Sequence, residues 1–311
     1  MTLPEPGTGA EMPMLTLPLP SAWARYEAIR ERLPAITARG TTRQVRGLLD
    51  VAAVFDGFLF DSFGVLNVGD TAIPGAAECL VALRHMGKRL RVLTNAASYT
   101  GDAALIKYRR MGLDVRRDEI ISSRDVTFAH LDAEAPGLNW GAIATEDDDF
   151  ADAGGVRMFD LLAAGTSWDA AEGLLFLSSA RWTADLQDRL VEALIHRPRP
   201  VVIGNPDLVA PREGGLSIEP GFWAHDLQDR TGTMPRLFGK PYPEAFRIAL
   251  SGMGPGRYAM IGDTLHTDIL GGQAAGLSTI LVTEHGIFAG HDTAPFIAQS
   301  GIVPDIALPS I

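Results

Sequence analysis

The chain has 311 residues, of which 46% are hydrophobic, and its formal net charge is −11. This length and hydrophobic content suit two domains. The negative charge argues against nucleic acid or an anionic membrane as the main partner, because both would repel this surface. The single cysteine, Cys79, excludes an intrachain disulfide and any site built from several thiolates. We expect Cys79 to be buried.

The N-terminal segment differs from the rest of the chain. Residues 1–20 contain five prolines and no basic start followed by an apolar run. This favours a flexible or surface-draped tail over a signal peptide. Residues 23–33 have the apolar spacing of a helix. The apolar runs are too short to cross a bilayer, so we expect a cytoplasmic protein that binds no membrane.

Short apolar runs alternate with amphipathic segments after residue 50. The pattern predicts strands at 58–60, 90–93, 258–261 and 278–282, and helices at 76–86, 103–111 and 268–275. Such alternation is typical of an α/β fold, a doubly wound Rossmann-like parallel sheet with helices on both faces. Because the same pattern returns near the end of the chain, we expect both ends to share one sheet.

The middle of the chain has its own alternation, which predicts an inserted α/β cap domain. Strands are expected at 140–144, 173–176 and 200–203, and helices at 158–164 and 183–195. The predicted division is a tail and helix (1–49), a first core part (50–125), the cap (126–232) and a second core part (233–311). We expect the acidic run at 146–149 to be a solvated loop, and favour an exposed loop for Arg181 and Trp182 over a place in the cleft.

Four short segments at or beside predicted strand ends contain the candidate functional residues. Ligands bind at this edge of open α/β sheets. An apolar strand leads to Asp61, and a carboxylate there either caps a turn or has a chemical role. Thr94 and Asn95 end the next strand, where they could hold phosphoryl oxygens or cap a helix.

The other two segments follow in the second core part. Lys240 lies between Gly239 and Pro241, where it is either a solvated charge or a neutraliser of charge in a transfer step. Asp263 and Asp268 are five residues apart, a pair that favours a hard cation, although Asp268 could instead cap a helix.

Together the four segments resemble the haloacid dehalogenase superfamily of aspartate-nucleophile enzymes. The matching strings are DSFGV, TNA, GKP and GDTLHTD. The string GNPDL, with Asn205 and Asp207, and the string GLSTILVTEHG are similar to subfamily IIA, the NagD and 4-nitrophenylphosphatase-like group whose C2 cap lies between the second and third motifs. The likeness covers about residues 50–305.

The resemblance implies a Mg²⁺-dependent phosphatase acting on a small phosphorylated metabolite such as a sugar, nucleotide or aryl phosphate. It implies that Asp61 forms an aspartyl-phosphate and that Thr94, Asn95 and Lys240 assist. It implies a Mg²⁺ site made by Asp61, the backbone carbonyl of Phe63, Asp263 and Asp268. It also implies that Asn205 and Asp207 orient the cap at the site entrance, and that caps of two copies can pair as a homodimer.

One position departs from the family pattern. Family phosphatases have an acidic residue two positions after the nucleophile, and here that residue is Phe63, which cannot transfer a proton. Three interpretations stay open. The first is a slow phosphatase that prefers substrates with good leaving groups, or that borrows an acid from Asp207, His266 or the substrate. The others are an enzyme of different chemistry and a non-catalytic phospho-ligand-binding or regulatory protein. Substrate identity, oligomeric state and the role of residues 1–49 are not predicted.

Overall fold

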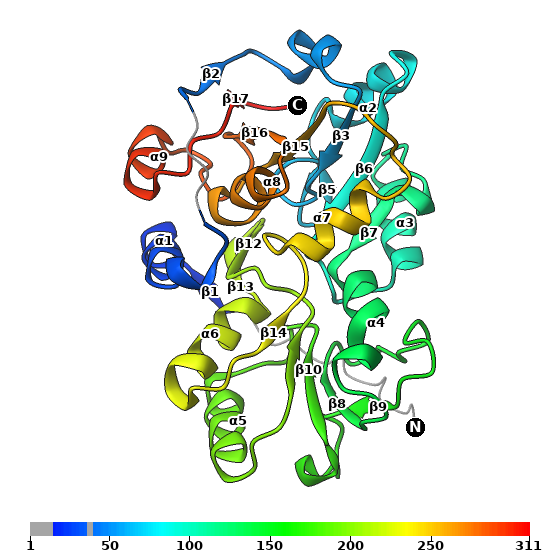
Figure 1. Cartoon of the computed structure of the whole chain (residues 1–311), viewed down its shortest axis with the longest axis vertical. Coiled ribbons are helices and arrows are strands. Elements are labelled where there is room, and N and C mark those ends of the chain that lie inside the picture. The colour runs from blue at the N-terminus through cyan, green and yellow to red at the C-terminus, as the bar shows by residue number, and fades with distance from the viewer. Residues whose placement is uncertain (1–14, 36–39) are drawn as a thin grey trace, which may run out of the picture.

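The computed structural model describes residues 15–35 and 40–311, which form two lobes, each built on a parallel sheet (Figure 1). The larger lobe has seven parallel strands in the order β2-β17-β16-β15-β3-β6-β7. Their bounds are Arg43–Gln44 (β2), Gly57–Phe60 (β3), Arg89–Thr94 (β6), Ile120–Ser122 (β7), Tyr258–Gly262 (β15), Ser278–Val282 (β16) and Ile306–Leu308 (β17). Both ends of the chain share this sheet, which confirms the predicted α/β class.

Both faces of the core sheet are covered. Phe58 and Phe60 of β3 pack into one hydrophobic cluster, whereas Leu59 between them packs into another. This explains why β3 reads as a continuous apolar run. The associated helices are α2 (Ala76–His85), α3 (Gly101–Arg110), α4 (Ser123–Glu134), α7 (Pro243–Leu250), α8 (Leu270–Ala274) and α9 (Ala294–Ser300). No helix of the described residues has the length and apolar character needed to cross a membrane.

Strand β3 lies at the point where the direction of winding changes. Its neighbours are β6, which follows it in sequence, and β15, which comes about 200 residues later. Such a switch point opens a crevice at the carboxyl ends of the strands. The loop after β3, which begins at Asp61, therefore enters this crevice.

The smaller lobe is the cap, with five parallel strands in the order β14-β11-β10-β8-β9. Its elements are β8 (Trp140–Ile143), β9 (Met158–Asp160), β10 (Gly173–Phe176), α5 (Ala184–His196), β11 (Val201–Ile203), α6 (Pro220–Thr231) and β14 (Arg236–Leu237). The helix predicted at 158–164 is wrong. Met158 pairs with Trp140 at the sheet edge, and a turn follows before Gly165. Pairing with β8 outweighs helix formation in so short a run.

A small antiparallel sheet joins the N-terminal segment to the cap. Its strands are β1 (Thr16–Leu17), β13 (Gly215–Ile218) and β12 (Val209–Arg212), and a further hairpin is formed by β4 (Asn67–Val68) and β5 (Thr71–Ala72). The predicted tail is therefore wrong for residues 16–20, which form β1 and the start of a helix, while residues 1–14 lie outside the described residues.

Helix α1 (Leu19–Ala28) packs against both lobes, and begins earlier than the predicted 23–33 helix (Figure 1). The indole Nε1 of Trp23 donates to Gln299 Oε1 of the core at 2.9 Å. The hydroxyl of Tyr26 accepts a hydrogen bond from the backbone N–H of Leu208 in the cap at 3.3 Å. An ion pair of 2.7 Å joins Arg25 to Asp229 of α6. Segment 16–28 thus forms a bridge between the cap and the core.

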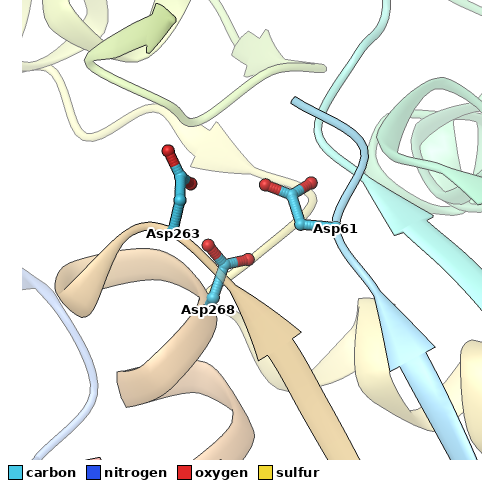
Figure 2. A group of neighbouring side chains, drawn as sticks. All are labelled: Asp61, Asp263 and Asp268. Carbon is cyan, nitrogen blue, oxygen red and sulfur yellow. The ribbon is translucent and has the colours of Figure 1, made fainter. Parts of the chain in front are cut away.

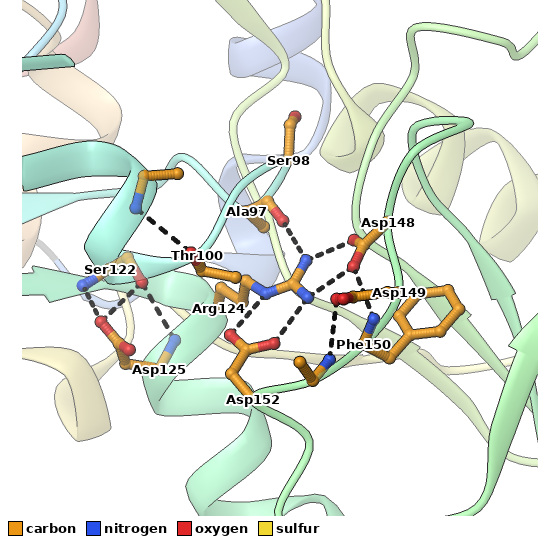
Figure 3. A network of polar contacts seen from close by, with 12 residues as sticks. Ala97, Ser98, Thr100, Ser122, Arg124, Asp125, Asp148, Asp149, Phe150 and Asp152 are labelled. Carbon is orange, nitrogen blue, oxygen red and sulfur yellow. Dashed lines mark hydrogen bonds and ion pairs between the residues drawn. The ribbon is translucent and has the colours of Figure 1, made fainter. Parts of the chain in front are cut away.

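The acidic run at 146–149 is not a fully solvated loop, so that prediction is wrong for Asp148. The side chain of Asp148 is 5% exposed and binds the fully buried guanidinium of Arg124, which also binds Asp152 and the carbonyl of Ala97 (Figure 3). Arg124 sits in the first turn of α4, and Ala97 follows β6 of the core. The Arg124 network therefore ties the loop after β6 to the cap.

Removing the charge of Arg124 should be strongly destabilising. We expect Arg124→Met to lower the free energy of unfolding by about 3 kcal/mol, because two carboxylates lose their buried partner. Arg117→Met is the matched control, since Arg117 is 42% exposed and its ion pairs with Asp102 and Asp125 should contribute less than about 1 kcal/mol. Urea unfolding of both variants measures the difference, and equal losses would contradict the buried-charge account.

Arg181 and Trp182 lie inside the cap, so neither the favoured exposed loop nor a place in the cleft is correct. Trp182 is 3% exposed, its ring is stacked with that of Trp168, and it meets the ring of Phe176 edge to face. The guanidinium of Arg181 binds Asp160 at 2.7 Å. A tryptophan buries a large area in a cap core, and this outweighs the exposure typical of a loop position.

Cys79 is buried in α2, as predicted, and burial raises the pKa of its thiol to about 11. At pH 8 the reactive thiolate should be on the order of one thiol in a thousand. We expect the native protein to react very slowly with a thiol reagent such as 5,5′-dithiobis(2-nitrobenzoate) at pH 8. In denaturant one thiol per chain should react at once. Rapid reaction of the folded chain would contradict this placement.

Candidate active site

Three carboxylates converge at the carboxyl edge of the core sheet (Figure 2). Asp61 follows β3, Asp263 follows β15, and Asp268 lies in the π-helical turn Leu265–Ile269. One oxygen from each lies within 4.8 Å of the others, and all three residues are buried. These are the oxygen ligands that a hard divalent cation prefers. The structure thus brings together the three acidic residues assigned to the metal from sequence.

Two glycines allow the carboxylates to approach the backbone so closely. Gly64 has φ = +79°, and a Cβ atom there would lie 2.5 Å from Asp263 Oδ2. A Cβ atom on Gly262 would lie 2.1 Å from the Asp268 side chain. Asp268 does not occupy the N-cap position of a helix, because it lies within the turn Leu265–Ile269. Its Oδ2 accepts a hydrogen bond from the backbone N–H of Thr264 at 3.1 Å, which closes the turn between the two acids.

Lys240 joins the nucleophile candidate to the acidic pair. Its ammonium lies 2.6 Å from Asp61 Oδ1 and 2.7 Å from Asp268 Oδ1, and only 1% of its side chain is exposed. Asn95 fixes the backbone of Lys240 from both sides, accepting from its N–H at 2.7 Å and donating to its carbonyl at 2.9 Å. Lys240 is therefore held in place, and the solvated-charge alternative does not apply.

Of the remaining predicted residues, Thr94, Asn205 and Asp207 line the pocket that contains Asp61, and Asn95 is bonded to Asp207 and Lys240 beside it. Thr94 is buried beside Asp61, and its Oγ1 accepts from the backbone N–H of Ala96 at 3.2 Å. Asn95 donates to Asp207 Oδ1 at 2.8 Å, which links the core to the cap. Asn205 donates to Glu219 Oε2 at 3.1 Å. The helix cap after this loop is Thr100, so Thr94 and Asn95 are not needed for that role.

Negative charge exceeds positive charge at the centre of the site. Burial, with Asp268 close by, raises the pKa of Asp61 to about 7 despite the attraction of Lys240. Burial and neighbouring carboxylates likewise raise the pKa of Asp263 and of Asp207 well above their usual range. A single ammonium does not compensate the acidic side chains gathered here. A bound divalent cation would supply the missing positive charge.

Phe63 occupies the position of the missing acid. Its ring lines the pocket with 8% of its surface exposed, and two cations lie near it. Lys107 Nζ lies 4.7 Å from the ring centroid, and the guanidinium carbon of Arg212 lies 4.5 Å from it. These distances are within the range of cation–π attraction.

His266 is not positioned to replace the acid. It is fully buried, its Nε2 bonds Glu27 Oε1 at 2.7 Å, and its ring stacks on Tyr26 of α1. Burial lowers the pKa of His266 to about 3, so the imidazole is neutral. Of the two protein candidates, only Asp207 lines the pocket.

Several lining residues were missed by sequence reasoning. Tyr99, Lys107, Arg212 and Glu219 lie around Phe63 or beside the pocket. Tyr99 could have been noticed, because it follows Asn95 by four residues in the same loop. Arg212 and Glu219 gave no local signal, since the cap hairpin places them opposite a core loop about 150 residues earlier.

Comparison with known proteins agrees with this geometry. A model of haloacid dehalogenase-like hydrolases matches residues 58–153, and a HAD-hydrolase-like model matches residues 237–308. Human glycerol-3-phosphate phosphatase is 30% identical over 291 residues, covering 82% of this chain and 88% of that protein. The chain therefore belongs to the haloacid dehalogenase-like hydrolases, which confirms the resemblance noted from the motifs.

Two solved structures place the chain more narrowly. A possible sugar phosphatase from Cytophaga hutchinsonii is 26% identical with a TM-score of 0.74, covering 86% of this chain and 98% of that chain. Glycerol phosphate phosphatase from Mycobacterium tuberculosis, solved with calcium, is 26% identical with a TM-score of 0.61, covering 75% of this chain and 67% of that chain. Within the family, the chain is similar to the capped group that contains these phosphatases.

Proposed function

We propose that this chain is a Mg²⁺-dependent phosphatase of small phosphorylated metabolites, with Asp61 as the covalent nucleophile. The observation that carries the proposal is the contact of Lys240 with both Asp61 and Asp268 beside the three-carboxylate cluster. Sequence relatives named as phosphatases support the reaction class. Sugar, nucleotide and aryl phosphates are the candidate substrates.

The donor set fits a divalent cation. Asp61, Asp263 and the backbone carbonyl of Phe63 would hold it, with Asp268 supporting it through water or the loop. The ion would screen the repulsion between the carboxylate nucleophile and the phosphate. The calcium-bound relative supports a divalent ion, and the preference for Mg²⁺ is our proposal.

The protein groups then have distinct roles in the transfer. Asp61 Oδ1 is held by Lys240 and by the backbone N–H of Ser62, so Oδ2 is the oxygen left to attack phosphorus. A bond forms between Oδ2 and phosphorus, and the bond from phosphorus to the leaving oxygen breaks. The Thr94 hydroxyl and the Asn95 backbone would hold the phosphoryl oxygens, while Lys240 stabilises their charge. Water then cleaves the aspartyl-phosphate and releases phosphate.

Turnover of p-nitrophenyl phosphate with and without Mg²⁺ tests the proposal. We expect measurable release of nitrophenol with Mg²⁺, loss of activity on chelation with EDTA, and recovery when Mg²⁺ is restored. Nitrophenol is a good leaving group, so the substrate does not depend on an acid at position 63. Activity that does not change on chelation would contradict the proposed metal dependence. Binding of phosphate without any turnover would contradict the proposed phosphatase activity.

The substitution at Phe63 favours one alternative, a protein that binds a phosphorylated ligand without turning it over. Beryllium trifluoride mimics the aspartyl-phosphate, and a crystal soaked with it and Mg²⁺ separates the two functions. We expect the mimic on Asp61. An unmodified Asp61 beside an ordered metal ion would favour binding or regulation over transfer. Different chemistry on the same fold is the third candidate, and the absence of phosphate release with any ester would favour it.

The remaining assignments are also proposals. We propose a cytoplasmic protein without nucleic-acid or membrane partners, in line with its charge of −11. We propose that two copies can pair through the cap. We also propose the division into core (50–125), cap (126–232) and core (233–311), in which β14 at the start of the last part adds an edge strand to the cap sheet. Asp207 would orient the cap through its bond to Asn95 of the core, and Asn205 would support Asp207 by accepting a hydrogen bond from its backbone N–H at 3.0 Å.

A further inference from the structure

A second cavity adjoins the catalytic pocket between the core and the cap. Its volume is about 270 Å³, compared with about 30 Å³ for the pocket that contains Asp61. The residues that line both are Ser98, Tyr99, Arg212 and Glu219. The cavity therefore lies next to the catalytic pocket, with these side chains of both lobes between them.

The catalytic pocket offers much less free space than the adjoining cavity. A space of about 30 Å³ holds two or three water molecules, whereas the adjoining cavity is several times larger. Once a phosphoryl group lies against Asp61 and Thr94, the rest of the ester must extend away from them. The adjoining cavity is the space that can receive it.

Two cations line this cavity, and neither is fully compensated. The Lys107 side chain is 18% exposed, and its ammonium pairs with Asp70 at 2.8 Å, a carboxylate that is 89% exposed. A pair with so exposed a partner is weak and easily exchanged. Arg212 uses Nη2 for Glu219 at 3.2 Å and Nε for Ser217 at 3.3 Å, which leaves Nη1 without a bond to the described residues.

Each cation has one acidic partner in the lining, Asp70 for Lys107 and Glu219 for Arg212, and Glu219 is shared with other donors. The buried carboxylate of Glu219 is engaged by Ser217, Asn205 and Arg212 at 2.6, 3.1 and 3.2 Å. In addition, Phe63 removes the carboxylate that family phosphatases have two positions after the nucleophile. Both cations lie within 5 Å of its ring, so the ring stands where an ion-pair partner would otherwise be.

Unpartnered hydroxyls complete the lining. Tyr99 Oη and Ser179 Oγ are both buried and have no hydrogen-bond partner among the described residues. Both residues line the cavity, together with Ser178 and Thr145. A buried hydroxyl without a partner is costly, so these two atoms mark places where a ligand oxygen would be favourable.

We propose that this cavity binds the leaving group of the substrate and selects a short leaving group that carries a carboxylate and a hydroxyl. The carboxylate would lie between Lys107 and the free edge of Arg212, where a planar guanidinium matches a carboxylate. The hydroxyl would meet Tyr99 and Ser179. This inference rests on the proposed phosphatase function, because it assigns the leaving group of that reaction.

Two phosphate esters that differ in one group test whether the cavity selects a carboxylate. 3-Phosphoglycerate and glycerol 3-phosphate share the phosphorylated carbon and the neighbouring hydroxyl, and differ by a carboxylate in place of a hydroxymethyl group. We expect kcat/KM to be at least about tenfold higher for 3-phosphoglycerate, the size of one charge-assisted bond. Equal values, or a preference for glycerol 3-phosphate, would overturn the proposal.

Variants of the two cations test whether these side chains cause the preference for 3-phosphoglycerate. Arg212→Gln and Lys107→Gln should each lower the ratio of the two kcat/KM values several-fold, and the double variant should abolish the preference. Arg230→Gln is the matched control, because Arg230 lies on the cap, is 38% exposed compared with 32% for Arg212, and does not line the cavity. The control should keep the wild-type ratio. A preference that survives the double variant would overturn the assignment.

Equilibrium binding separates this proposal from the phosphatase itself. We expect Asp61→Asn protein to bind 3-phosphoglycerate at least about tenfold more tightly than glycerol 3-phosphate in calorimetry, with or without any turnover by the wild type. Selective binding by a chain that hydrolyses no ester would refute the phosphatase and retain the subsite. Turnover of p-nitrophenyl phosphate without selective binding would refute the subsite and retain the phosphatase.

Discussion

Asp61→Asn should abolish turnover of p-nitrophenyl phosphate, with kcat falling on the order of 10⁴-fold or more. The amide has nearly the shape of the carboxylate, but its oxygen is a poor nucleophile and it brings no negative charge to a metal ion. Loss of a nucleophile typically removes most of the rate enhancement of an enzyme. Steady-state kinetics with saturating Mg²⁺ measures the effect.

The fold should survive this substitution. Asp61 is a buried carboxylate among others, and removing one of them relieves repulsion while it weakens the pair with Lys240. Asp102→Asn is the control, since Asp102 is 85% exposed and lies outside the site. The control should keep wild-type kcat. If Asp61→Asn folds normally and retains more than a tenth of the activity, Asp61 is not the nucleophile.

Phe63→Asp should raise turnover of alkyl phosphates more than that of aryl phosphates. A positioned acid and base typically contributes about 10² to 10⁴ in rate, and alkoxide leaving groups need the proton most. We expect an increase near the lower end of that range for glycerol 3-phosphate. The cations of Lys107 and Arg212, both within 5 Å of the present ring, would stabilise the ionised form of the new carboxyl group and lower its pKa, so that less of it is protonated and able to donate a proton at neutral pH.

The measurement is kcat for glycerol 3-phosphate and for p-nitrophenyl phosphate in parallel. Phe63→Asn is the control, because it introduces a polar side chain of the same size as Asp without a titrating proton. An increase shared equally by both esters, or reproduced by Asn, would show that position 63 limits the rate by packing rather than by proton transfer.

The core and the catalytic centre could be predicted from sequence because their signals are local. Phe58 to Phe60 form a continuous apolar run, and the parallel order of such strands brings the residues at their carboxyl ends to one edge. Asp61 and Asp263 each follow such a strand of the core sheet, whereas Lys240 follows β14 at the edge of the cap sheet and is marked by the Gly239 and Pro241 on either side of it. The topology of the fold then brings these residues together, so no contact between distant parts of the sequence had to be assumed.

The cap interior and the cavity could not be predicted in the same way. Arg124 and Asp148 are 24 residues apart, and only the folded cap makes them partners. The guanidinium of Arg212 in the cap contacts the ring of Phe63 in the core across the interface of the two lobes. No periodicity in the sequence predicts such a contact. At Met158 a local pattern suggested a helix, but pairing with β8 decided the outcome.

The bridge formed by segment 16–28 has a consequence for the rate of substrate exchange. The cap cannot swing away from Asp61 on a free hinge, because Thr16 pairs with Ser217 of the cap while Trp23 and Gln299 bind the same segment to the core. Opening would have to break these contacts as one cooperative unit, as in local unfolding. Product departure could then be slower than the chemical step, and the amide protons of β1 and β13 would exchange with solvent at the rate of that opening.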